Sequence, residues 1–292
     1  MNKKCCWTKK IAWQIKYFNN NFKKILKKYL TYCPKKFKSA ILYSLFPGGK
    51  RIRPMLIFAS GEMCGVSIGK LLIPSISIEL VHNYSLVHDD LPSMDNDDYR
   101  RGKLTVHKKF SESTAILVGD ALLTLGFEIF LKNFSIKRLK EILGLFANYI
   151  GLEGLIAGQV LDIESENTKK LKSEKVKSLL KNIHINKTAK LIELCITIPG
   201  IIKNLSSKKI RVLHKIGRNY GLLFQITDDY LDSKTSQDEK KLTYPKVYGL
   251  AETKNIINKL YVHTQKLINQ NFEIEKSGYM LYLLDLIVNR SN

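Results

Sequence analysis

Two short acidic clusters hold the side chains best suited to bind a metal ion. The first is DDLPSMDNDDYRRG (89–102) and the second is DDYLD (228–232), and each follows a long apolar segment. Carboxylates held close together repel one another unless a cation joins them. Acid-rich turns are commonly only solvated surface. Two such clusters in a chain with 48 Lys and Arg against 26 Asp and Glu favour metal binding.

The spacing of the acidic residues indicates how each cluster is presented. Asp228 and Asp232 are one helical turn apart, so a helix places them on the same face. In the first cluster Pro92 ends the preceding helix, so we expect Asp95 on a turn. Hard oxygen ligands that leave coordination positions open for a phosphate substrate favour Mg²⁺ over zinc.

A basic motif, PGGKRIRP (47–54), is suited to bind a diphosphate. Its two glycines permit close backbone approach, and Lys50, Arg51 and Arg53 supply a compact group of cations. The motif does not satisfy the P-loop pattern GxxxxGK[ST]. A basic surface loop is the alternative interpretation.

Helical periodicity runs through almost the whole chain and positions these motifs. Within the first predicted helix, His82 lies seven residues before Asp89, on nearly the same face and roughly 10 Å away along the axis. A histidine on a helix is also commonly a core or surface residue, so spacing alone leaves its role open. The clearest predicted helices span 78–92, 115–131, 211–232 and 278–290.

Length and composition predict one folded domain. The chain has 292 residues, 45% of them apolar, and strand-like alternation with turn dipeptides is absent. No Pro/Gly/Ser-rich linker divides it, and the polar stretch 164–178 is equally well a solvated loop and helix face. The predicted fold class is therefore all-α, in a single domain over residues 1–292.

The formal net charge of +22 raises the question of a nucleic-acid partner. Only eight of the 48 basic residues are arginine, the residue favoured for base readout, and the lysines are spread over the chain. We therefore predict no nucleic-acid partner. Four of the eight arginines belong to the two motifs 47–54 and 89–102, where a planar guanidinium suits phosphate.

Cysteine usage and hydropathy predict a cytoplasmic protein. The five cysteines show no metal-binding spacing and are odd in number, which indicates free thiols in a reducing compartment. The first residues are lysine-rich without the apolar core of a secretory signal. No run of 18 or more apolar residues occurs, so no membrane span is expected.

The motifs, taken in order, resemble those of the trans-isoprenyl diphosphate synthases, most closely the bacterial farnesyl diphosphate synthase type. The resemblance runs from about residue 40 to the end of the sequence. It implies a bundle of long helices around a deep central cavity, and a homodimer. Its segments are GGKRIRP, ELVHNYSLVHDDLPSMDNDDYRRGKLTVHKKF, VGDALL, GQVLDIE, NKTAKLI, FQITDDYLD and TYPKVYGL.

The resemblance implies a role for each matching residue. Three Mg²⁺ ions on an allylic diphosphate would be held by Asp89, Asp90, Asp95, Asp228, Asp229 and Asp232. Isopentenyl diphosphate would contact Lys50, Arg53, His82 and Arg101, with Gly49 beside them. The allylic diphosphate would contact Arg100, Lys187, Thr188 and Gln225, assisted by Lys241.

The reaction implied is head-to-tail condensation to farnesyl diphosphate. The allylic diphosphate loses its diphosphate, the double bond of isopentenyl diphosphate attacks the allylic cation, and a proton is lost to the released diphosphate. No side-chain general base is then required. Tyr84, five residues before Asp89, would set product length at C15, although periodicity alone makes it a core aromatic.

The sequence also departs from the family pattern. Asn96 stands where an aspartate is usual, Tyr99 replaces a usual leucine, and the loop 233–242 is shorter than in relatives. The shortened loop leaves lid closure and rate open. Geranyl or geranylgeranyl diphosphate synthase, a class I terpene cyclase and a non-catalytic prenyltransferase subunit remain as alternatives, though both aspartate motifs and GGKRIRP favour a catalytic prenyltransferase.

Overall fold

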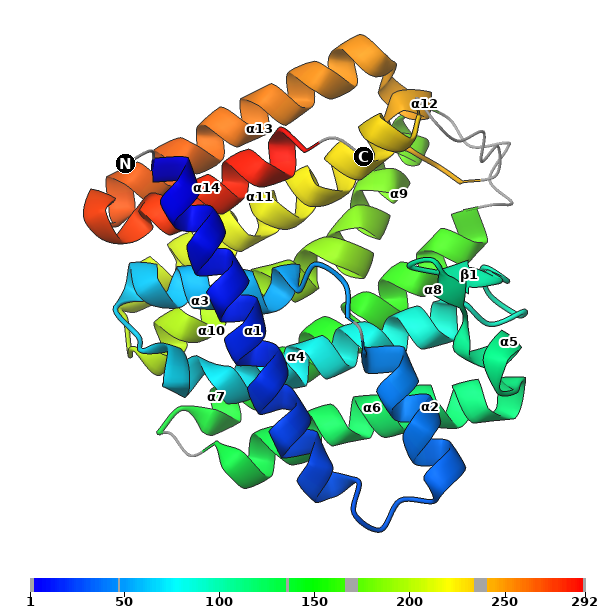
Figure 1. Cartoon of the computed structure of the whole chain (residues 1–292). Helices are drawn as coiled ribbons and strands as arrows, with labels where there is room; N and C mark the ends of the chain where they lie inside the picture. The colour runs from blue at the N-terminus through cyan, green and yellow to red at the C-terminus, as the bar shows by residue number, and fades with distance from the viewer. Residues whose placement is uncertain (1–2, 47, 135–136, 166–172, 234–240, 291–292) are drawn as a thin grey trace. The chain divides into compact units, whose positions relative to one another are not determined.

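The computed structural model describes residues 3–46, 48–134, 137–165, 173–233 and 241–290. In these ranges the chain is almost entirely helical, which confirms the predicted all-α class (Figure 1). Its elements are α1 (Lys3–Tyr29), α2 (Lys35–Leu45), α3 (Ile52–Cys64), α4 (Ile68–Asp89), β1 (Tyr99–Arg100), β2 (Lys103–Leu104), α5 (Val106–Lys109), α6 (Glu112–Asn133), α7 (Leu139–Ile150), α8 (Leu155–Ser165), α9 (Ser173–Ile183), the π-helix η1 (His184–Ala189), α10 (Lys190–Ile202), α11 (Ser207–Asp232), α12 (Tyr244–Tyr248), α13 (Leu250–Asn271) and α14 (Ile274–Val288).

The chain divides into two compact units, each made of two segments. Unit 1 comprises residues 1–55 and 69–135, and unit 2 comprises 56–68 and 136–292. The first acidic cluster and the basic motif therefore belong to unit 1, and the second acidic cluster belongs to unit 2. The prediction of one domain stays a prediction.

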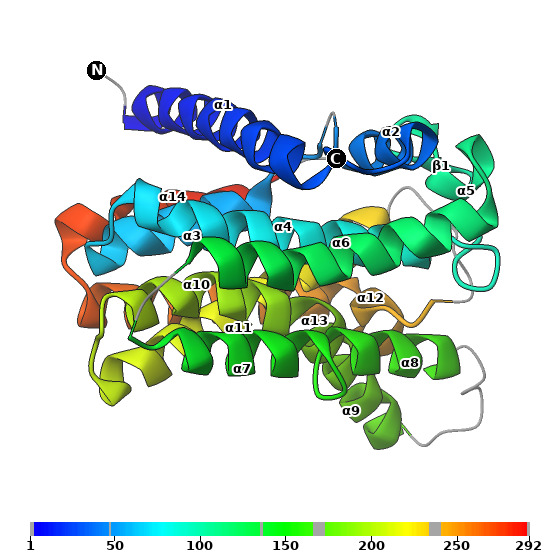
Figure 2. The same cartoon turned by 90° about the horizontal axis from the view of Figure 1, so that it is seen from below.

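In unit 1, α4 and α6 pack closely against each other (Figure 2). Gly126 of α6 permits this approach, since a Cβ there would lie 3.2 Å from the Ser77 carbonyl oxygen of α4. Ser111 caps the N-terminus of helix α6, because its hydroxyl accepts a hydrogen bond from the Thr114 amide at 3.1 Å. Its apolar residues are not buried all round in this chain, because Leu117 is 56% exposed and Leu131 is 57% exposed.

Helix α4 carries His82 and the start of the first acidic cluster. It spans 68–89 where the sequence predicted a helix over 78–92, and Asp95 lies on the turn that follows, as predicted. Leu80, Val81 and Val87 are buried along it and anchor it in the core of unit 1. This packing fixes the positions of Asp89 and Asp90 at the C-terminal end of the helix.

A small hairpin in unit 1 was not predicted from the sequence. Strands β1 and β2 pair antiparallel through a two-residue turn in which Arg101 and Gly102 have φ of 54° and 73°. Positive φ at both central residues is the conformation of a type I′ hairpin turn. The usual sequence of such a turn is Asn-Gly. Here the two residues are Arg-Gly, so the sequence did not indicate the turn. The hairpin places Arg100 and Arg101 side by side after the acidic cluster.

In unit 2, α11 is the central helix and packs against α10, α13, α14 and η1 (Figures 1 and 2). Ser206 caps the N-terminus of α11, because its hydroxyl accepts a hydrogen bond from the Lys209 amide at 3.4 Å. Tyr220 is fully buried, and its hydroxyl donates to the Met280 carbonyl at 2.5 Å. These contacts fix α11 along its length, so that DDYLD is presented at its C-terminal end.

Two helical stretches among the described residues are long and apolar enough to cross a membrane by length and composition alone, Glu112–Asn133 and Leu139–Ser165. Buried core helices of soluble proteins satisfy the same criterion, so these stretches are weak evidence for a span. The second is interrupted by a turn between α7 and α8.

Candidate active site

Unit 1 contains a pocket of about 300 Å³ next to the first acidic cluster. Its polar lining includes Gly49, Lys50, Arg100, Arg101 and Asp90. Its apolar lining comes from Leu86, Val87, Leu104 and Val106. A pocket with several cations beside an apolar surface suits a small amphiphile that carries an anionic group.

Gly49 has a geometric reason to be glycine. A Cβ at this position would lie 2.7 Å from the guanidinium carbon of Arg101. The absence of a side chain therefore lets the loop before α3 approach the hairpin turn. This contact brings Lys50 and Arg101, which the family resemblance assigns to one substrate, to the same pocket.

Arg51 was predicted to belong to the cationic group, and this prediction is wrong. Its side chain is fully buried and donates to Glu79 Oε1 at 2.6 Å and to the Leu45 carbonyl at 2.8 Å. A third hydrogen bond, at 3.0 Å, reaches Asn19 Oδ1. The Arg51 backbone has φ of 51°, a left-handed conformation that turns its side chain away from the direction of its neighbours. Its guanidinium carbon lies 5.7, 5.8 and 5.4 Å from the ring centroids of Phe18, Phe22 and Phe46.

His82 lies in a strongly positive part of unit 1. Burial, followed by the charges of Arg53, Arg101, Arg51 and Arg100, lowers its pKa well below the ordinary value. The ring is therefore neutral near pH 7. Arg53 and His82 do not line the described pocket, but the arginine charges at His82 favour an anion there.

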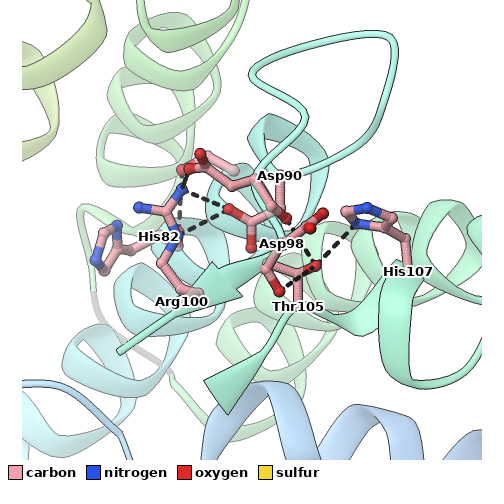
Figure 3. Close-up of polar contacts among 8 residues, drawn as sticks. His82, Asp90, Asp98, Arg100, Thr105 and His107 are labelled. Atoms are coloured by element: carbon pink, nitrogen blue, oxygen red, sulfur yellow. Dashed lines mark hydrogen bonds and ion pairs between the residues drawn. The ribbon is translucent and has the colours of Figure 1, made fainter. Parts of the chain in front are cut away.

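Asp90 and Arg100 form the central ion pair of the unit 1 site (Figure 3). Arg100 Nε and Nη2 both donate to Asp90 Oδ1, at 2.8 and 2.5 Å, and Nη2 also reaches Asp97 Oδ2 at 2.7 Å. Burial raises the pKa of Asp90, while the hydrogen bond from Arg100 opposes that rise. A predicted metal ligand and a predicted diphosphate contact therefore neutralise each other here.

The hairpin is held in place by Thr105, which the sequence did not single out (Figure 3). Its hydroxyl donates to the Asp97 carbonyl at 2.9 Å and contacts His107 Nδ1 at 3.0 Å. Both side chains are buried. They connect the hairpin to α5 and so help to fix Arg100.

The remaining aspartates of the first cluster lie on a tight turn. The Asp95 amide donates to the Asp89 carbonyl at 2.9 Å, which brings the end of the motif back to the end of α4. Asn96 follows with φ of 54°. Asparagine tolerates this left-handed conformation better than most residues, which is a local reason for its presence.

Tyr84 is 5% exposed and packs edge-on against the ring of His88, with 5.8 Å between centroids. Burial, and then the charge of Asp89, raises the pKa of its hydroxyl to about 12. Within the described part of the chain this buried hydroxyl has no hydrogen-bond partner. An unpaired buried hydroxyl is costly, and packing alone would be served as well by phenylalanine.

In unit 2, two aspartates of DDYLD have clearly different surroundings. Asp228 Oδ1 pairs with Arg290 Nη2 at 2.6 Å. Asp229 is buried and accepts from the Tyr244 amide at 2.9 Å and from Gln225 Nε2 at 3.2 Å. Burial raises the pKa of Asp229 to about 7, and the two hydrogen bonds only partly offset that effect.

His184 lies beside Asp229, with 3.4 Å between Nε2 and Oδ2. Burial, followed by the charge of Lys187, lowers the pKa of His184 to about 3, so the ring is neutral. It stacks on Tyr244 at 5.1 Å between centroids. Neither residue was predicted from the sequence to belong to the site, although Tyr244 lies in the noted segment TYPKVYGL.

The π-helix η1 carries two of the predicted allylic-site residues of unit 2, Lys187 and Thr188. Thr188 Oγ1 donates to Gln225 Oε1 at 2.9 Å, which links η1 to α11. Lys187 Nζ donates to Asp162 Oδ2 of α8 at 2.6 Å. Gly158 makes this approach possible, since a Cβ there would overlap the Lys187 backbone. A π-helical turn inside a longer helix is common at functional sites.

Lys241 lies shortly before α12, and its carbonyl accepts from Lys246 Nζ at 2.7 Å. Most of the shortened loop, residues 234–240, lies outside the described residues.

Comparison with known proteins identifies the family. The family model described as polyprenyl synthetase matches residues 34–270. The chain belongs to the polyprenyl synthetase family. This confirms the resemblance to trans-isoprenyl diphosphate synthases. Helices α1 and α14 lie outside the matched region.

Two of the similar relatives differ in the product that their names give. The chain is 43% identical over 231 residues to a farnesyl diphosphate synthase of Micrococcus luteus, covering 75% of this chain and 78% of the relative. It is 40% identical over 273 residues to a chloroplastic geranylgeranyl pyrophosphate synthase of Catharanthus roseus, covering 89% and 75%. These names do not decide between C15 and C20 products.

Solved structures agree with the fold. A geranyltransferase from Legionella pneumophila superimposes with a TM-score of 0.89 at 32% identity, covering 100% of this chain and 99% of that one. A geranyltranstransferase from Thermotoga maritima gives 0.81 at 30% identity, covering 96% and 99%.

The aspartates of this synthetase fit magnesium by their chemistry. All six predicted ligands supply hard carboxylate oxygens, which Mg²⁺ prefers. Among the described residues no group of three His, Cys, Asp or Glu side chains is already gathered as a metal site. Asp90 and Asp228 are instead paired with arginines, so a metal must compete with these cations.

Proposed function

We propose that this polyprenyl synthetase condenses isopentenyl diphosphate with dimethylallyl and geranyl diphosphates to give farnesyl diphosphate. The single observation that carries the proposal is the unit 1 pocket, where Lys50, Arg100 and Arg101 stand beside an apolar lining. The cations suit a diphosphate and the apolar side chains suit a five-carbon chain. In the reaction a C–O bond of the allylic substrate breaks, a C–C bond forms and a proton leaves with diphosphate.

The proposal assigns the two aspartate motifs to magnesium. Asp89, Asp90 and Asp95 form one ligand set, and the second is Asp228, Asp229 and Asp232. Bound Mg²⁺ would neutralise the charge that develops on the departing diphosphate. In unit 1 the proposed contact of the allylic diphosphate is Arg100, which is already held by Asp90. In unit 2 the proposed contacts are Lys187, which is already held by Asp162, and Thr188, Gln225 and Lys241.

A homodimer is part of the proposal. The dimer proposal is supported by exposed apolar side chains on two helices, α6 of unit 1 and α8 of unit 2. On α6 these residues include Ile116 and Leu117, and on α8 they include Ile156, Val160 and Ile163. Exposed apolar patches of this kind commonly mark protein interfaces.

The direct test of the product is an incubation of the purified protein with isopentenyl and dimethylallyl diphosphates and Mg²⁺. Chromatography of the dephosphorylated alcohols is expected to give farnesol as the main species. A wild-type protein that stops at C10 would be a geranyl diphosphate synthase. One that proceeds to C20 would be a geranylgeranyl diphosphate synthase, the second candidate that the relatives suggest.

Lys50→Ala is expected to raise the KM for isopentenyl diphosphate by about 10- to 100-fold, the scale of a lost charge-assisted hydrogen bond. His82→Ala should act on the same substrate by up to about tenfold, because its ring is neutral. Initial rates with each substrate varied in turn measure both effects. Lys70→Ala, an exposed lysine of α4, is the control and should leave both KM values unchanged. A rise in the KM of the allylic substrate instead would show that the two diphosphate sites are wrongly divided.

Tyr84→Ala is expected to lengthen the main product from C15 to C20 or beyond. The physical reason is that removal of the ring would leave space where the growing chain is proposed to stop. Tyr84→Phe is the matched control, since it keeps the ring and removes only the unpaired hydroxyl, and it should still give C15. A Tyr84→Ala protein that makes only C15 would leave Tyr84 as a core aromatic.

A further inference from the structure

Arg290 is a cation at the second aspartate motif whose contact with it was not predicted from the sequence. It follows α14, and its side chain is 16% exposed. Its Nη2 lies 2.6 Å from Asp228 Oδ1, and the Asp228 side chain is 36% exposed. The pair joins residues 62 positions apart within unit 2, so it arises from the fold and not from local sequence.

Phe224 holds the guanidinium independently of Asp228. Arg290 Nη2 also donates to the Phe224 carbonyl at 2.7 Å, and the guanidinium carbon lies 4.3 Å from the centroid of the Phe224 ring. Both contacts are made one helical turn before Asp228 on α11. Arg290 is therefore fixed at this carboxylate even when the carboxylate has another partner.

Unit 1 contains the same combination. Arg100 pairs with Asp90, another proposed metal ligand, at 2.5 Å. In each unit, then, an arginine held by further contacts neutralises one aspartate of the motif. A fixed positive charge next to a carboxylate disfavours the binding of a second cation to that carboxylate.

We propose that Arg290 is a resident counter-ion of DDYLD that lowers the magnesium affinity of the second motif. The inference rests on the proposed function, because it takes Asp228 to be a magnesium ligand. In the ligand-free protein Arg290 neutralises Asp228 and keeps it in place. A bound diphosphate supplies negative charge of its own, so that magnesium binding is favoured mainly when the substrate is present.

The test compares Arg290→Gln with Arg290→Lys in the full-length protein. Binding of Mn²⁺ alone, followed by electron paramagnetic resonance with Mg²⁺ as competitor, measures affinity without turnover. Arg290→Gln is expected to bind about three- to tenfold more tightly than wild type, the scale of one partly screened charge. Arg290→Lys keeps the charge and should stay within about twofold of wild type. Arg211→Gln, an exposed arginine on the same helix as Asp228, changes net charge equally and should leave affinity unchanged.

Unchanged or weaker Mn²⁺ binding by Arg290→Gln would overturn the inference, and so would a similar gain in Arg211→Gln. Asp228→Asn should weaken Mn²⁺ binding, which verifies that the signal reports the second motif.

Turnover by the wild type separates the counter-ion inference from the proposed function. A wild type that forms product only with Mg²⁺, together with an unaffected Arg290→Gln, refutes the counter-ion role alone. A wild type that binds no Mn²⁺ and forms no product contradicts the proposed function as well.

Discussion

Asp89→Ala and Asp228→Ala are each expected to lower turnover by about 10²–10³-fold at saturating Mg²⁺. This is the scale observed when one preorganised group that stabilises charge in the transition state is removed. Both residues are assigned to magnesium in the proposed function, one in each aspartate motif. Single-turnover assays with geranyl and isopentenyl diphosphates would measure the loss at the chemical step.

The control for this prediction is Asp98→Asn. Asp98 belongs to the same acidic cluster, but its half-exposed carboxylate pairs with Lys108 at 2.8 Å and has no assigned role in binding. It should retain turnover within about twofold of wild type, since exposed ion pairs contribute little. Near wild-type rates in Asp89→Ala or Asp228→Ala would contradict the assignment of that motif to the metal.

Arg51→Ala is expected to destabilise the protein by about 3–5 kcal/mol, because it leaves the buried Glu79 carboxylate without its cation. The Arg51 and Glu79 side chains are 0% and 3% exposed, so water cannot replace the lost partner. Urea denaturation followed by circular dichroism would measure the change in the first unfolding transition. The loop that carries Lys50 should be destabilised together with unit 1, because Lys50 directly precedes Arg51.

A double variant separates charge burial from packing. Arg51→Met with Glu79→Leu removes both charges and should recover most of the loss, since an apolar pair of similar volume replaces a buried ion pair well. Arg138→Ala is the matched control, because the side chains of its pair with Glu141 are 27% and 43% exposed, and it should change stability by about 1 kcal/mol or less. An Arg51→Ala loss as small as that of Arg138→Ala would show that the buried pair is not structural.

The sequence predicted the elements whose signal is local. Apolar periodicity identified α4, α6, α11 and α14, and the packing of their buried faces confirms them. Pro92 correctly indicated that Asp95 lies on a turn after α4, although the helix ends at Asp89, before the proline. The family resemblance implied that Lys50 and Arg101 contribute to one site, and both residues line the unit 1 pocket.

The errors and omissions have a common cause in long-range contacts. Arg51 looks equivalent to Lys50 and Arg53 in the sequence, and only its left-handed backbone and the acid at Glu79 show that it belongs to the core. The ion pair of Arg290 with Asp228 could not be predicted, because the two residues meet only after α14 has packed against α11.

The same holds for Asp162 and His184. Asp162 lies in the noted segment GQVLDIE, between Leu161 and Ile163, and an acid between apolar residues was a signal that could have been followed. His184 belongs to a π-helical turn, a conformation that no residue pattern in the chain announced.

The measurement that tests the central claim most directly is incorporation of radiolabelled isopentenyl diphosphate into an extractable prenyl diphosphate. The purified protein would be incubated with dimethylallyl diphosphate, with Mg²⁺ or with excess EDTA, and without the allylic substrate. We predict labelled product that requires both the allylic diphosphate and Mg²⁺, with one diphosphate released for each C–C bond formed. Folded protein that incorporates no label with both present, or that incorporates it equally in EDTA, would contradict the proposal.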